Sequence, residues 1–192
     1  RGFLKFLTPD NFYAGMDNQA VVGVYSACYK LSIFMSLGIQ AFRYAAEPFF
    51  FSQAKDKKSP ELFSTIMNWF VIVGCFVFLF ISLNLDWIAP IVIRSESFRT
   101  GLAIVPILLL ANLFLGMYYN LSIWFKLSEK THWGTILAIL GALITIIGNV
   151  VLIPIIGYMG SAYTTLACYL IMTVVSYVAG QKYYQMPYQL LK

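Results

Sequence analysis

Long stretches without a charged residue dominate the chain and predict helices that cross a membrane. Three such stretches cover residues 62–85, 100–125 and 133–181. A membrane-spanning helix needs about 20 predominantly apolar residues, so the first two stretches fit one span each. The third stretch has room for two spans, with a break that Pro154 and Gly157 supply.

A long apolar segment upstream of these stretches adds a fifth span. The chain is therefore predicted to be an all-α, polytopic membrane helix bundle, with spans at about 19–52, 60–85, 101–125, 133–153 and 158–180. The first span would be roughly 50 Å long at 1.5 Å per residue, and Pro48 predicts a kink in it. Residues 1–17 are expected to be the end of a preceding helix and a loop, and residues 86–99 a polar loop.

Composition supports the membrane class over the soluble one. The chain is 60% hydrophobic and 11% charged, with a mean hydropathy of +0.76, whereas soluble domains average about 25% charged residues. A large soluble protein with buried helices would need polar helix faces, which these stretches lack. The three cysteines all fall inside predicted spans without CxxC spacing, so no disulfide or metal site is predicted: Cys28, Cys75 and Cys168.

Small and polar side chains within the spans predict contacts between helices. In the fourth span small residues recur at three- and four-residue steps, and such a stripe lets a neighbouring helix approach closely. The stripe consists of Gly134, Ala138, Gly141, Thr145 and Gly148. Polar residues within spans are expected mostly to form interhelical hydrogen bonds: Asn68, Asn112, Tyr118, Tyr119, Asn120, Asn149, Tyr163 and Tyr169.

The basic residues of the predicted loops set the orientation, because cytoplasmic loops carry an excess of lysine and arginine. One side of the membrane holds Lys55, Lys57, Lys58, Lys126, Lys130, Lys182 and Lys192. The other side holds Arg1, Lys5, Arg94 and Arg99. The first side is therefore predicted to be cytoplasmic. Its positive charge is suited to anionic lipid headgroups, and nucleic acid is not an expected partner.

The first span is the exception among the helices, because it carries charged residues within the apolar region. A charge in hydrocarbon costs about 2.5–3.5 kcal/mol or more, so such residues usually face a bundle interior or a wet cavity. Steps of three and four residues place a polar row on one helix face: Ser32, Ser36, Gln40, Arg43 and Glu47. Lys30 lies roughly 140° around the helix from Arg43. Alternatively, Arg43 and Glu47 neutralise each other near the membrane surface.

Motifs for enzymatic chemistry are missing from the sequence. His132 is the only histidine, and there is no GxSxG motif, P-loop or paired aspartate motif. We therefore expect neither an enzyme nor a bound cofactor or metal. Transport by this chain would have to draw on an ion gradient, the membrane potential or consumption of the product.

Several segments, in order, resemble bacterial polysaccharide (O-antigen-type) flippases. Residues 23–30 (GVYSACYK) and 40–48 (QAFRYAAEP) are similar to the eighth helix of that family, and residues 105–111 (VPILLLA) to the tenth. Residues 149–157 (NVVLIPIIG), followed by 160–162 (GSA), resemble its junction between helices eleven and twelve. The family belongs to the multidrug/oligosaccharidyl-lipid/polysaccharide exporter superfamily.

This resemblance implies a two-lobe transporter of the bacterial inner (cytoplasmic) membrane, in which residues 1–192 form most of the second lobe and both ends are truncated. The family flips an oligosaccharide on undecaprenyl pyrophosphate, so the expected partners are that lipid-linked oligosaccharide, membrane lipids and the missing N-terminal lobe. A pyrophosphate needs cationic partners in a wet cavity. Arg43 and Lys30 are predicted to bind pyrophosphate or sugar acids, Gln40 and Ser36 the sugar hydroxyls, and Glu47 to tune Arg43 or carry a proton.

Other classes remain open at this point. A lipid II flippase or a cation-coupled multidrug antiporter of the same superfamily would share the fold, although an antiporter should carry acidic residues deep in its cavity. A membrane-embedded glycan polymerase or ligase should have a large outer loop with acids or arginines. A purely structural membrane subunit would not need the polar row of the first span.

Overall fold

The computed structural model describes residues 2–9, 12–13, 17–54, 56, 58–93, 95–183 and 187, and every regular element in them is helical. The elements are α1 (Gly2–Leu7), α2 (Asn18–Gln53), α3 (Ser59–Leu83), α4 (Leu85–Val92), the 3-10 helix η1 (Glu96–Gly101), α5 (Ile104–Leu121), α6 (Ile123–Leu127), α7 (His132–Ile156) and α8 (Tyr158–Tyr183). The predicted all-α fold class is confirmed.

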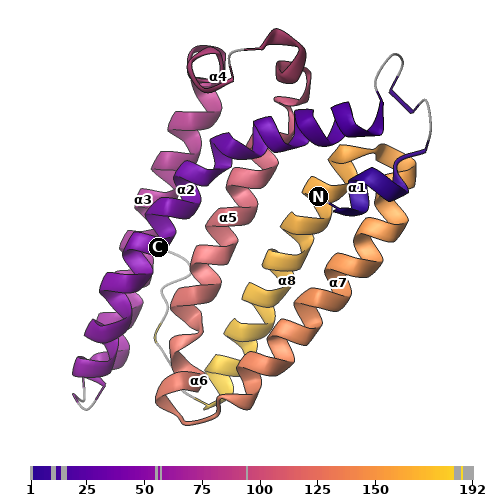
Figure 1. Cartoon of the computed structure of the whole chain (residues 1–192). Coiled ribbons are helices and arrows are strands. Elements are labelled where there is room, and N and C mark those ends of the chain that lie inside the picture. The colour runs from indigo at the N-terminus through magenta and orange to yellow at the C-terminus, as the bar shows by residue number, and fades with distance from the viewer. Residues whose placement is uncertain are drawn as a thin grey trace.

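Within the described residues, five helical stretches are long and apolar enough to cross a membrane, and together they define a multi-pass membrane protein. They are α2, α3, the continuous pair α5–α6, α7 and α8. Each agrees with a predicted span to within a few residues. Figure 1 shows them running alongside one another, with α4 and the α7–α8 turn at one end of the bundle and α6 at the other. The α5–α6 stretch is the most buried of the five and α3 the least.

The segment predicted as a polar loop is helical, so that prediction is wrong. Residues 85–92 form α4 and residues 96–101 form η1. The reason is the apolar content of 85–93: Ala89 and Ile93 are buried in the core, whereas Trp87 and Ile91 are each 81% exposed. A short helix with one buried side and an exposed tryptophan is typical of a membrane interface.

The helix α2 continues through Pro48 and ends at Gln53. Figure 1 shows α2 changing direction in the half nearest its N-terminus, so the visible bend is not at Pro48. The side chain of Asp17 caps the start of the helix by accepting a hydrogen bond from the Asn18 amide at 2.7 Å.

The predicted small-residue stripe brings α7 against α8. A Cβ atom added at Gly148 would lie 2.6 Å from Thr164, and one at Gly141 would lie 2.7 Å from the sulfur of Met172. Thr145, between them, donates to the sulfur of Cys168 at 3.5 Å. Three of the five stripe residues therefore lie in this interface; Gly134 meets Phe125 instead, and Ala138 is exposed.

The backbone at the turn between α7 and α8 requires glycine at two positions. Gly157 has a φ of +61°, which a residue with a side chain rarely adopts. At Gly160 an added Cβ would lie 2.6 Å from the backbone carbon of Leu152. Tyr13 stacks on Tyr158 with ring centroids 4.8 Å apart, and its hydroxyl accepts a hydrogen bond from the Tyr158 amide. The segment before α2 is thereby tied to the start of α8.

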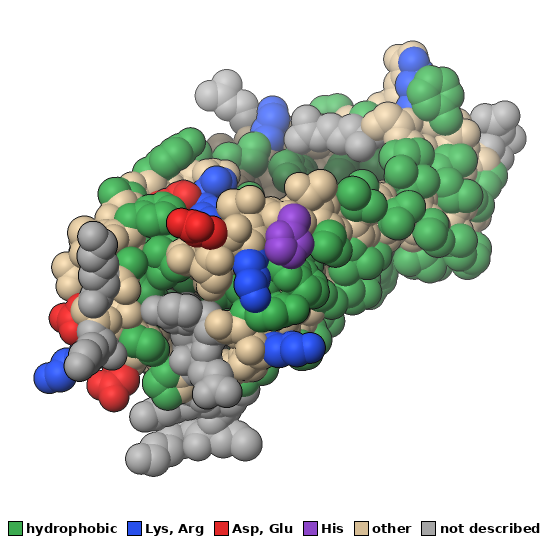
Figure 2. Space-filling model, turned by 90° about the horizontal axis from the view of Figure 1, so that it is seen from below, with side chains coloured by type: hydrophobic (Ala, Val, Ile, Leu, Met, Phe, Trp, Pro, Cys, Tyr) green, Lys and Arg blue, Asp and Glu red, His purple; other side chains and the backbone are tan. Residues whose placement is uncertain are grey.

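The predicted charge pattern agrees with the helix ends as far as the described residues test it. The ends that carry Lys58, Lys126, Lys130 and Lys182 gather at the α6 end of the bundle, which Figure 2 views directly, and basic side chains are visible there. Lys5 and Arg99 lie on α1 and η1 at the opposite end. Outside the described residues lie Arg1, Lys55, Lys57, Arg94 and Lys192. Which end is cytoplasmic stays a prediction.

Candidate functional site

The polar row of α2 faces α5, and its first members are hydrogen-bonded within the bundle. Ser32 is completely buried and donates to the Tyr29 carbonyl at 2.8 Å. Ser36 donates to Oδ1 of Asn112 on α5 at 3.1 Å. The upper part of the row therefore joins two helices.

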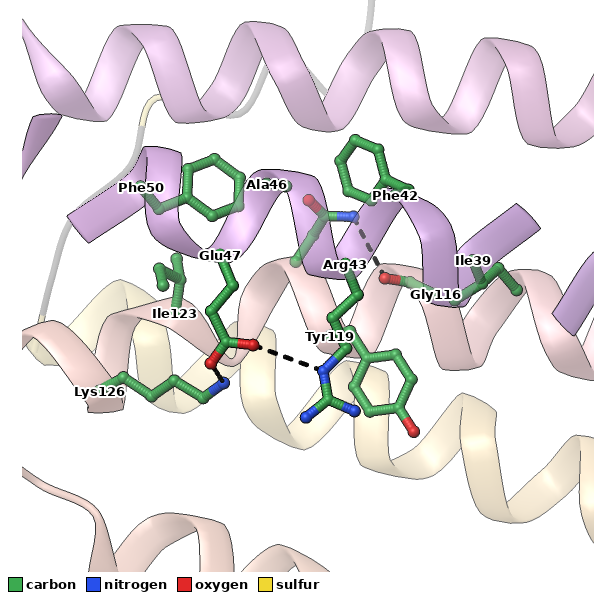
Figure 3. Close-up of a pocket in the computed structure, with 11 residues that line it drawn as sticks. Ile39, Phe42, Arg43, Ala46, Glu47, Phe50, Gly116, Tyr119, Ile123 and Lys126 are labelled. Atoms are coloured by element: carbon green, nitrogen blue, oxygen red, sulfur yellow. Dashed lines mark hydrogen bonds and ion pairs between the residues drawn. The ribbon is translucent and has the colours of Figure 1, made fainter. Parts of the chain in front are cut away.

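The lower part of the row forms an ion-pair cluster between α2 and α6. Nε of Arg43 lies 3.5 Å from Oε2 of Glu47, one helical turn on, and Nζ of Lys126 donates to Oε1 of the same carboxylate. Figure 3 shows Arg43 and Glu47 projecting from the same side of α2, with the Glu47 carboxylate joined both to Arg43 and to Lys126. One carboxylate thus joins two cations, and we call these three residues the Arg–Glu–Lys cluster.

An aromatic ring on α5 supports the arginine. The Arg43 guanidinium carbon lies 4.6 Å from the ring centroid of Tyr119, within the range of a cation–π contact. The side chains of the cluster are between 27% and 36% exposed. These side chains are partly desolvated, but a ligand can still reach them. Partly exposed charges suit a binding role better than fully buried charges.

A narrow cleft adjoins the cluster. Its volume is about 20 Å³, close to what one ordered water needs. Asn120 lines it and donates to the Gly116 carbonyl at 3.2 Å. Its buried Oδ1 accepts no hydrogen bond from the described residues. The cleft therefore presents two cationic groups, one carboxylate and a buried amide oxygen beside apolar walls.

The five residues predicted for the site do not all come together. Arg43 and Glu47 do, in the cluster. Ser36 lies higher on the same face against Asn112, and Gln40 is partly exposed and outside the cleft lining. Lys30 is exposed on another face of α2, the one that carries the exposed Phe34 and Leu37.

Sequence reasoning missed the site residues from α5 and α6: Tyr119, Asn120 and Lys126. The sequence pattern places Lys126 in a loop, where it serves only to set the orientation. A usable signal was present, because Glu47 and Lys126 both stand near the predicted cytoplasmic ends of their spans. Opposite charges at one depth on different spans favour an ion pair.

Two of the asparagines expected to bond between helices differ from prediction. Asn112 does contact another helix, but Asn120 and Asn149 donate to carbonyls of their own helices, at 3.2 and 2.6 Å. A short amide side chain reaches the carbonyl four residues back without help from a neighbour. The expected interhelical bonds are therefore wrong for these two residues.

Comparison with known proteins identifies no relative: no family model, curated protein or solved structure matches the chain. Among the described residues, no group of three or more His, Cys, Asp or Glu side chains is arranged to hold a metal ion. The fold defines a multi-pass α-helical membrane protein.

Proposed function

We propose that this chain belongs to a transporter that flips an oligosaccharide linked to undecaprenyl pyrophosphate across the bacterial inner membrane, for cell-surface polysaccharide synthesis. In this proposal the chain supplies most of the second lobe. Two features support it: the ordered resemblance of five segments to O-antigen-type flippases, one of which contains Arg43 and Glu47, and the Arg–Glu–Lys cluster with its third residue, Lys126, from another span. The observation that carries the proposal is the placement of Arg43 and Lys126, from two different spans, around one carboxylate.

The chemistry of the cluster suits a diphosphate. Two cations against one carboxylate leave one net positive charge, and arginine pairs with phosphate oxygens through two parallel hydrogen bonds. The carboxylate of Glu47 has the planar pair of oxygens that a phosphate also offers. We infer that the substrate's diphosphate takes the place of Glu47 as the partner of Arg43 and Lys126. Glu47 then keeps the two cations paired between transport cycles.

The size of the cleft connects binding to motion. A cleft of about 20 Å³ is smaller than a diphosphate group. A diphosphate that binds inside this cleft would therefore require α2 to move away from α5 and α6, which would break the link between Glu47 and Lys126. Alternating access moves one part of a transporter against another around the substrate site, and separation of α2 from α5 and α6 would be a movement of this kind.

The remaining predicted residues take different roles in the proposal. Ser36 already bonds to Asn112, so it holds α2 against α5. Gln40 stays a candidate for sugar hydroxyls. Lys30 lies away from the cluster and would contact a different part of the substrate, such as a sugar acid, on the exposed face of α2.

The alternatives receive less support from the geometry. An antiporter needs a carboxylate free to bind the coupling cation, whereas Glu47 already pairs with two cations. A polymerase or ligase needs a large outer catalytic loop, and the segment between α3 and α5 is occupied by the short helices α4 and η1. A lipid II flippase handles the same diphosphate chemistry, so only the glycan distinguishes it from the proposal.

Complementation in three bacterial hosts would separate these functions. One host lacks its O-antigen-type flippase, one is depleted of its lipid II flippase, and one lacks its drug antiporters. The reading frame that contains this chain should restore surface polysaccharide in the first host alone. Rescue of growth in the second host, or of drug resistance in the third, without rescue in the first would overturn the proposal. Because sugar specificity can block complementation, the first host should be tested with several polysaccharide loci.

A further inference from the structure

A second concave surface lies on the outside of the bundle, at the end where α7 begins and α8 ends. It is an apolar groove of about 360 Å³, with Trp133 on α7 and Val174, Val178 and Tyr183 on α8 among its lining residues. Val174 and Val178 are one helical turn apart and are 51% and 63% exposed. The groove therefore runs along α8 toward the middle of the span, where a lipid chain would lie.

Two lysines stand at the mouth of this groove. Nζ of Lys130 lies 3.6 Å from the ring centroid of Tyr183, and Nζ of Lys182 lies 5.9 Å from the same centroid. Lys182 also lines the groove. Within the part of the chain that the structure describes, neither lysine forms an ion pair with a carboxylate. The groove mouth therefore carries two positive charges that no described acidic side chain balances.

The aromatic residues hold the mouth in place. Tyr183 stacks on the buried Trp124 with centroids 5.6 Å apart and packs against Trp133 at 5.9 Å. Trp124 itself is fixed by a hydrogen bond from its indole N–H to the Ser176 carbonyl at 3.1 Å. Tryptophan and tyrosine favour the headgroup region of a bilayer. The ring of Tyr183, over which Lys130 lies, is thus part of a packed aromatic cluster at membrane-surface depth.

We propose that this groove binds one anionic glycerophospholipid. Its phosphate lies between Lys130 and Lys182, its glycerol region against Trp133 and Tyr183, and one acyl chain along Val174 and Val178. The charge decides the class of lipid: a zwitterionic headgroup gains little from two unbalanced cations, and free phosphate would leave the apolar groove unused. The site is separate from the Arg–Glu–Lys cluster, whose lysine is already paired with Glu47. It does not depend on the proposed transport function.

Fluorescence quenching by brominated lipids can test this site, because bromine on an acyl chain quenches only nearby tryptophans. The complete protein is reconstituted in phosphatidylcholine vesicles with a small fraction of brominated phosphatidylglycerol or brominated phosphatidylcholine. The Trp133 signal is the difference between the protein and its Trp133→Phe variant. We expect brominated phosphatidylglycerol to quench this signal at clearly lower mole fractions than brominated phosphatidylcholine.

Lysine variants give the decisive comparison. Lys182→Gln and Lys130→Gln should each lower the preference for phosphatidylglycerol about fivefold, as expected for one cation near an anionic headgroup. Lys182→Arg should keep the preference. Lys58→Gln is the matched control, since Lys58 is exposed at the same end of the bundle but outside the groove.

Two results would overturn the proposal. One is equal quenching by the two brominated lipids in the unmodified protein. The other is a loss in Lys58→Gln as large as that in Lys182→Gln, which would indicate diffuse surface attraction alone. If a glutamine variant loses its helical circular dichroism, native mass spectrometry of the unmodified protein decides the matter: retained phosphatidylglycerol supports the site, and its absence rejects it.

Discussion

The interface between α7 and α8 and the interface of α2 with α5 and α6 are built on opposite principles. The first is uncharged and tight: glycines at 141 and 148 let side chains of α8 approach to distances that leave no room for a Cβ atom. The second holds Arg43, Glu47 and Lys126, a serine–asparagine hydrogen bond and a narrow cleft. Both lie within spans of one small bundle.

The difference indicates which contact is fixed and which can move. Packing of small residues is lost steeply when helices separate, because dispersion contacts need close distances. Ion pairs and hydrogen bonds can be exchanged for a ligand of matching charge. We therefore expect α7 and α8 to stay together while α2 separates from α5 and α6.

The largest expected effect comes from filling the tight interface. Gly148→Leu should destabilise the protein by about 1–3 kcal/mol, because the new side chain must displace Thr164 and push α8 away. The thermal unfolding midpoint of the purified protein in detergent measures this loss.

Gly38→Leu is the matched control. Gly38 also lies inside a predicted span, but a Cβ added there has nothing within 4 Å. Its unfolding midpoint should stay at or above that of the unmodified protein, since leucine favours helix over glycine. Equal losses in the two variants would contradict the tight packing of α7 on α8.

A smaller effect is expected from the charged interface. A double-mutant cycle with Glu47→Gln and Lys126→Gln should give a coupling energy of about 0.5–1 kcal/mol, the range for pairs that solvent still partly screens. Unfolding midpoints of the four proteins provide the cycle. The Glu96–Arg99 pair, with Glu96 92% exposed at a separation of 4.0 Å, should show no measurable coupling. If Glu47 and Lys126 also show no measurable coupling, the ion pair does not link α2 to α6.

The smallest expected effect concerns the upper part of the polar row. Ser36→Ala removes the hydrogen bond to Asn112 and should cost about 0.6 kcal/mol, the average for such bonds between membrane helices. Ser52→Ala should be near neutral, because the exposed Ser52 donates only to the Phe49 carbonyl of its own helix. Hydrogen exchange of the α5 backbone should rise in the first variant alone. If both variants exchange alike, Ser36 does not hold α2 on α5.

The spans themselves could be predicted from the sequence, because about 20 uncharged residues in a row leave few alternatives to a membrane helix. The contact of Gly141 and Gly148 with α8 was also predictable from the spacing of small residues. The helix α4 was missed because eight residues that include Pro90 give little periodicity. Its existence depends on Ala89 and Ile93 being buried by other helices, a tertiary contact that local sequence does not reveal.

Of the site residues, only those on α2 could be predicted from the sequence. The charges of Arg43 and Glu47 are conspicuous in an apolar helix, and their spacing already indicated an ion pair. For Lys126 the sequence offered one signal, its position at the same predicted depth as Glu47. The contact of Arg43 with Tyr119 could not be assigned, since the register between α2 and α5–α6 follows from packing along the whole interface. The separation of Lys30 from Arg43 was foreseen from helix geometry, and the exposed position of Lys30 agrees with it.

The most direct test of the central claim is the amount of surface polysaccharide in a host without its own O-antigen-type flippase, with Arg43→Ala and Arg43→Lys beside the unmodified protein. At equal protein abundance, we expect the unmodified protein to restore export and Arg43→Ala to abolish it. Arg43→Lys should retain part of the export, because it keeps the charge but not the two-pronged hydrogen bonding. Full export by Arg43→Ala, with normal abundance in the membrane, would contradict the claim that the Arg–Glu–Lys cluster binds the substrate's diphosphate.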